Sequence, residues 1–66
     1  MQRSYKNQHR NFQRNEKVQI LVDSLWEDYT SPCGSKLVVE FCLRAERIYG
    51  MRNVRIVHKR HNPELF

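Results

Sequence analysis

Apolar residues are distributed unevenly along this chain, and that distribution limits what it can fold into. Only three of the first seventeen residues are apolar, against twenty-three of the remaining forty-nine. A segment so poor in apolar side chains cannot bury enough surface to offset the conformational entropy it would lose on folding. We therefore expect residues 1–14 to form a flexible, disordered basic arm and residues 15–66 to form a single small domain.

The length of 66 residues excludes several classes of protein. It is too short for a TIM barrel or a dinucleotide-binding fold. No run of eighteen apolar residues is present, so the sequence predicts no transmembrane helix. The basic N-terminal residues are not followed by an apolar stretch, and we expect no secretory signal. These features predict a small, soluble, basic domain.

Residues 15–30 carry the clearest periodic pattern in the chain. At 100° per residue the apolar side chains fall within a sector about 140° wide, and only Ile20 lies outside it. Asn15 is a suitable N-cap, and Glu16 would complement the positive end of the helix dipole. We predict an amphipathic helix over residues 15–30. Its apolar face would consist of Val18, Leu21, Val22, Leu25, Trp26 and Tyr29.

A second amphipathic helix is predicted between Pro32 and Gly50. Ser31 can cap it with Pro32 at the first helical position, and Ser35 is the alternative cap. Gly50 stands where a helix-terminating glycine is expected. A strand over residues 37–43 is the rival interpretation, which agrees with the β-branched content but not with these end signals. The apolar face of this helix would consist of Leu37, Val38, Phe41, Cys42, Ala45, Ile48 and Tyr49.

After Gly50 the pattern changes to partial alternation, with Val54, Ile56 and His58 on one face. This predicts one strand within residues 51–58. A single strand cannot satisfy its own backbone groups, so its partner must be an N-terminal segment or the same strand of a second copy. We expect a homodimer. The sequence thus predicts an α+β fold of two packed amphipathic helices followed by one C-terminal strand.

The two cysteines lie nine residues apart on the predicted second helix, which corresponds to about 13 Å. A disulfide requires Cα atoms within about 7 Å, so we expect free thiols and a reducing compartment, cytoplasmic or nuclear. Cys33, Cys42, His58 and His61 give the spacing C-x8-C-x15-H-x2-H. Neither half matches the spacing of a structural zinc site, and we expect no metal and no cofactor.

The short motifs that accompany catalysis are missing from the sequence. It contains no Gly-x-Ser-x-Gly and no His-Glu-x-x-His, and its two glycines are too few for a phosphate-binding loop. Asp23, Glu27 and Asp28 would project from the solvated side of the predicted first helix, as ordinary surface charges do. We therefore expect a protein that is not an enzyme.

The net charge of +5 is divided into two basic ends and an acidic middle: residues 1–17 and 44–66 each carry a net +4, and residues 18–43 carry −3. Clustered arginine and lysine side chains bind phosphate, and Tyr5, His9 and Phe12 are rings that could stack on bases. We predict a small regulatory protein that binds RNA or DNA. The predicted contact residues are Arg3, Lys6, Arg10, Arg14, Arg44, Arg47, Arg52, Arg55, Lys59 and Arg60.

The alternative prediction is a protein-interaction module that binds and modulates a larger partner enzyme. The aromatic side chain of Trp26 precedes the acidic Glu27 in the sequence, a combination suited to an anchor in a partner's groove. In this hypothesis Ile20, Trp26 and Tyr29 contact the partner, and the brevity of the chain suggests a viral or phage-encoded regulator. A membrane-surface role is disfavoured because the basic clusters lie outside the amphipathic helices.

Overall fold

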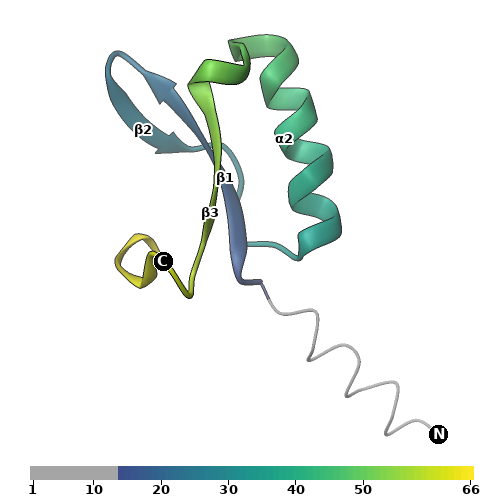
Figure 1. The fold of residues 1–66 in the computed structure, drawn as a ribbon, viewed down its shortest axis with the longest axis vertical. Coiled ribbons are helices and arrows are strands. Elements are labelled where there is room, and N and C mark those ends of the chain that lie inside the picture. The colour runs from purple at the N-terminus through teal and green to yellow at the C-terminus, as the bar shows by residue number, and fades with distance from the viewer. Residues whose placement is uncertain (1–13) are drawn as a thin grey trace, which may run out of the picture.

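The computed structural model describes residues 14–66, in which three antiparallel strands form a sheet covered on one face by a helix (Figure 1). The strands follow the order β2-β1-β3, so β1 is central. Figure 1 shows α2 on one side of the sheet and the C-terminal turn η2 on the other. The elements are β1 (Glu16–Val22), β2 (Leu25–Asp28), α2 (Ser35–Tyr49), the 3-10 helix η1 (Met51–Asn53), β3 (Val54–His58) and the 3-10 helix η2 (Pro63–Leu65).

The predicted helix over residues 15–30 is wrong, because this segment is the β1–β2 hairpin. Val22 pairs with Leu25, which leaves Asp23 and Ser24 as a two-residue turn. Their φ angles are 52° and 69°, and a type I′ hairpin turn requires positive φ at both positions. The fold is therefore α+β with three strands and one helix in residues 14–66, not two helices and one strand.

The helical spacing in this segment arose because both faces of the hairpin carry apolar side chains. Val18 and Val22 lie on the face toward α2, whereas the cross-strand pair Leu21 and Trp26 lies on the opposite face. Their combined positions imitate an i, i+3, i+4 stripe. Ile20, the one residue outside that stripe, lies on the same face as Val18 in the alternation of a strand.

The turn provides a test of the hairpin. At its φ of 69°, the Cβ atom of Ser24 is sterically disfavoured, and glycine, which has no Cβ, avoids this cost. We expect Ser24→Gly to raise the free energy of unfolding by about 0.5–1 kcal/mol, net of the greater entropy of the unfolded glycine chain. If residues 15–30 formed a helix instead, Ser24→Gly would lower the free energy of unfolding by about 1 kcal/mol. Urea denaturation of both proteins measures the sign, and a lower midpoint for the variant would contradict the turn.

The predicted second helix and the C-terminal strand are confirmed. Helix α2 follows Gly34 and begins at Ser35, so Pro32 lies ahead of it; the rival strand over residues 37–43 is wrong. At its other end Gly50 has a φ of 91°, and its N–H donates to the carbonyl of Glu46. Strand β3 pairs with β1 of the same chain. The partner of β3 is thus an N-terminal segment, the first of the two predicted alternatives. The dimer loses one of its two reasons, the lack of a partner strand, and keeps the other, the small core.

The core between α2 and the sheet is small. Val18 of β1 and Ala45 of α2 are both 0% exposed, and Ile20 and Val38 are buried beside them. The small side chain of Ala45 allows the helix backbone to approach the sheet closely. Five partly buried side chains complete this layer: Val22, Tyr29, Phe41, Cys42 and Val54.

Both thiols are free, as predicted, but only one lies on the helix. Cys33 precedes α2 and pairs through its backbone with Glu16, extending the β2 side of the sheet. Burial raises the pKa of the Cys42 thiol, and its contact with the Glu46 carboxylate at 3.5 Å acts in the same direction. Within residues 14–66, no helix combines the length and apolar character needed to cross a membrane.

Candidate functional site

The start of β1 and the end of β3 meet at one end of the sheet. The Lys59 N–H donates to the carbonyl oxygen of Asn15 at 2.8 Å, one step beyond the paired residues Glu16 and His58. This bond extends the antiparallel ladder and holds together two segments that are far apart in the sequence. Arg14, which precedes Asn15, therefore lies at the same end of the sheet as the exposed basic residues that follow β3.

A tight turn displays those residues. The His58 carbonyl accepts hydrogen bonds from the N–H groups of His61 and Asn62 at 3.0 and 2.9 Å. The Arg60 N–H donates to His58 Nδ1 at 3.0 Å, and the rings of His58 and His61 meet edge to face at 5.7 Å. With the backbone fixed in this way, the side chains of Lys59 and Arg60 remain exposed.

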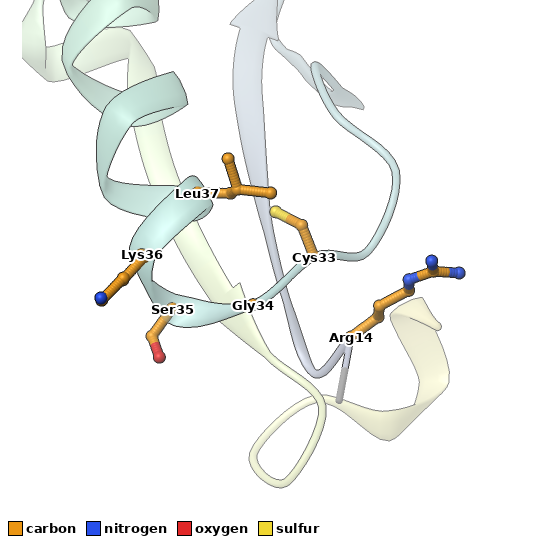
Figure 2. Close-up of a pocket in the computed structure, with 6 residues that line it drawn as sticks. All are labelled: Arg14, Cys33, Gly34, Ser35, Lys36 and Leu37. Atoms are coloured by element: carbon orange, nitrogen blue, oxygen red, sulfur yellow. The ribbon is translucent and has the colours of Figure 1, made fainter. Parts of the chain in front are cut away.

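A pocket of about 270 Å³ lies at the same end, between Arg14 and the start of α2. Figure 2 shows Cys33 and Leu37 turned toward one another, while the Arg14 and Lys36 side chains extend to opposite sides. The pocket therefore has an apolar floor and a basic rim, with no carboxylate or imidazole in its lining. The complete lining is Arg14, Cys33, Gly34, Ser35, Lys36 and Leu37.

We name this region the basic end and define it by Arg14, Lys36, Lys59 and Arg60. In residues 14–66 a single ion pair forms, between Lys17 and Asp28, and it involves none of these four side chains. Their charges are therefore available to an anionic ligand. Lys36 was not among the predicted contact residues, because in the sequence it is an isolated cation in the acidic middle segment.

The other predicted contact residues fall into separate groups. Arg44, Arg47 and Arg52 are exposed along the C-terminal half of α2 and on η1. The Arg44 guanidinium lies 5.6 Å from the centre of the Phe41 ring. Arg55 lies elsewhere, on the sheet face away from α2. Arg3, Lys6 and Arg10 lie outside the described residues, as does most of the predicted arm.

The sheet face away from α2 carries a connected polar network. Asp28 accepts hydrogen bonds from Lys17 Nζ and from Gln19 Nε2, both at 2.9 Å. Gln19 Oε1 in turn accepts from Arg55 Nη2 at 2.7 Å, and the Arg55 guanidinium lies 4.2 Å from the centre of the Trp26 ring. The hydrogen bond from Gln19, followed by that from Lys17, holds the pKa of Asp28 below its ordinary value.

Lys17 is almost completely buried on this face, with 4% of its surface exposed. Its ammonium group also donates to the Leu65 carbonyl and lies 4.8 Å from the centre of the Phe66 ring. The C-terminal turn η2 therefore covers Lys17 and joins the polar network to the end of the chain. This network satisfies the hydrogen-bonding groups of its buried side chains, which makes it structural in character.

The residues of the alternative prediction do not form one surface. Ile20 is 7% exposed and belongs to the core. Tyr29 is partly buried against the same core and packs edge to face on Tyr49 at 6.0 Å. Trp26 lies on the opposite face of the sheet, where Arg55 stacks on its ring. A partner could not contact all three predicted anchors at once.

Among residues 14–66, no group of three or more His, Cys, Asp or Glu side chains is placed to hold a metal ion. The sequence matches no protein-family model and no curated protein, and the fold matches no solved structure.

Proposed function

We propose that this chain binds nucleic acid without catalysis, through phosphate contacts made by its basic end. The observation that carries the proposal is the hydrogen bond from the Lys59 N–H to the Asn15 carbonyl, which holds the backbone next to Arg14 against the backbone that precedes Arg60. Arg3, Lys6 and Arg10 precede Arg14 in the sequence, and the proposal includes them on that ground alone.

The chemistry of the basic end suits a phosphate backbone better than a single small anion. Its four cations are exposed, and only Arg14 and Lys36 lie on the rim of the apolar pocket, while Lys59 and Arg60 lie on the turn after β3, so their donors do not converge on one point. A polyanion can contact such dispersed cations one after another, and the release of its counterions drives binding. The proposal covers RNA and DNA, because phosphate contacts are common to both.

The test compares two charge-matched pairs of substitutions in the full chain. Lys59→Gln with Arg60→Gln removes two charges from the basic end, and Arg47→Gln with Arg52→Gln removes two from the other arginine group. Single-stranded and duplex RNA and DNA are titrated at several salt concentrations by fluorescence anisotropy. We expect the first pair to reduce the slope of log K against log salt by about 1.4–1.8, since each phosphate contact contributes about 0.7–0.9.

The second pair serves as the control and should leave the slope and the affinity near those of the unaltered protein. Equal losses for both pairs would indicate diffuse charge attraction without a site. Failure of the unaltered protein to bind any of the four nucleic acids at low salt would overturn the proposed function.

A further inference from the structure

Strand β3 forms one edge of the sheet, and half of its backbone groups face away from β1. The Lys59 N–H points to Asn15, which directly precedes β1, and in an antiparallel ladder alternate residues point to the same neighbour. Glu16 and Val18 of β1 bond to the opposite side, toward Cys33 and Tyr29, which agrees with this assignment. The residues whose backbone groups face the open edge are therefore Val54, Ile56 and His58.

These three residues have six backbone groups at the open edge, three N–H and three carbonyl groups, and two of the six already have partners within the chain. The Val54 N–H donates to the Met51 carbonyl, and the His58 carbonyl accepts from the turn that follows β3. Two donors and two acceptors have no partner among residues 14–66: the N–H groups of Ile56 and His58 and the carbonyls of Val54 and Ile56. Such an edge is a template for another strand.

This set of groups is self-complementary about a two-fold axis at Ile56. Antiparallel pairing of two copies places Ile56 opposite itself and His58 opposite Val54. Each copy then donates from Ile56 to the partner's Ile56 carbonyl, and from His58 to the partner's Val54 carbonyl. The four bonds use every free group on both edges. The Val54 N–H and the His58 carbonyl face each other in this register, and both keep the partners they already have within their own chain.

The side chains favour the same register. Centred on Ile56, it places Arg55 opposite the apolar Val57 of the second copy. Centred on Arg55, it would place two guanidinium groups opposite each other, and centred on Val57 it would oppose Arg55 and Lys59. Like charges directly opposite each other destabilise a sheet. Of these three registers, only the one at Ile56 avoids this conflict.

Apolar surface beside the edge provides further area to bury. Ile56 lies on the face toward α2 but remains 41% exposed, so the helix does not cover it. Helix α2 exposes apolar side chains on both flanks of its buried face, Leu37 and Ile48 on one and Val39 on the other. A stable interface requires about 1,000 Å² or more in total, which a five-residue seam reaches only with such flanking contacts.

We infer that β3 pairs with β3 of a second copy, forming a dimer with a continuous six-stranded antiparallel sheet. The inference is independent of nucleic-acid binding, because it uses the opposite side of β3 from the contact that forms the basic end. The homodimer predicted from the sequence is thus proposed again for a different reason, the unpaired backbone groups at a sheet edge.

The first test measures the mass of the full chain in solution by analytical ultracentrifugation over a range of concentrations. We expect twice the 8.1 kDa of one chain at high concentration. Ile56→Lys, which sets two ammonium groups opposite each other at the axis, should raise the dimer dissociation constant about tenfold or more. Leu25→Lys is the matched control, because Leu25 is an exposed apolar residue on β2, the other edge strand. Circular dichroism verifies that both variants are folded.

A chain that remains monomeric at all concentrations would overturn the inference, as would a dimer that Ile56→Lys and Leu25→Lys weaken equally. Amide exchange measured by NMR identifies the surface directly. Protection of the Ile56 and His58 amides should rise with protein concentration, while Arg55 and Val57 stay protected throughout because they bond to β1. Protection of Ile56 that is equally strong in dilute monomer would mean that another part of the same chain covers the edge, and would contradict the dimer.

Discussion

Replacing Ala45 with glutamate should abolish the folded state under conditions in which the unaltered chain is folded. Ala45 is 0% exposed at the centre of the contact between α2 and β1, with no space and no cation for a carboxylate. An unpaired buried charge costs about 3–5 kcal/mol even after the structure relaxes. The core of a domain of this size rarely supplies more than about 3–5 kcal/mol of stability. Far-UV circular dichroism and urea denaturation measure the loss.

The matched control is Leu43→Glu, two residues earlier on the same helix. Leu43 is 56% exposed, so its glutamate remains in water, and we expect a change of about 0.5 kcal/mol or less. Each variant introduces one glutamate in place of an apolar residue, so both have the same net charge and nearly the same helix propensity. A cooperative unfolding transition for Ala45→Glu with an unchanged midpoint would mean that α2 does not pack on the sheet through this face.

The sequence predicted those elements whose ends carry their own chemical signals. Gly50 can adopt the positive φ that ends a helix, and from this signal the sequence placed the end of α2 where the structure has it. The alternation of Val54 and Ile56 likewise identified β3. The β1–β2 hairpin has no such mark, because its turn is Asp23-Ser24 and not the Asn-Gly or Asp-Gly typical of type I′ turns. With the turn unrecognised, apolar residues on both faces of the strands read as one helical stripe.

The basic end was only partly predictable, for a different reason. Charge counting identified Arg14, Lys59 and Arg60, since it needs no fold. Their proximity depends on the pairing of β1 with β3, a contact between distant segments that no local pattern encodes. The helix predicted over residues 15–30 places Lys17 and Asp28 on its solvated side, as an ordinary surface cation and an ordinary surface acid. The ion pair between them could not be predicted, because it depends on the pairing of β1 with β2, which the sequence pattern did not indicate.

That pair should respond asymmetrically to substitution. Asp28→Ala leaves the buried Lys17 ammonium with only the Leu65 carbonyl and the Phe66 ring, and we expect a loss of about 2 kcal/mol. This is less than for a fully buried pair, because the Asp28 side chain is 51% exposed. Lys17→Met removes the buried charge but keeps the volume and the contact with Phe66. Its cost should be within about 1 kcal/mol, since the exposed Asp28 carboxylate returns to water.

The double variant Lys17→Met, Asp28→Ala distinguishes charge pairing from packing. If the cost of Asp28→Ala is the desolvated ammonium, the double variant should be more stable than Asp28→Ala alone, although it carries one more substitution. Acid supplies an independent check: the pKa of Asp28 is lowered on folding, so its contribution is present above its ordinary value of 3.8 and is lost as the pH falls through the folded value. The urea midpoints of the unaltered protein and Asp28→Ala should therefore converge well below pH 3.8. Midpoints that remain equally far apart there would assign the loss to packing and not to the ion pair.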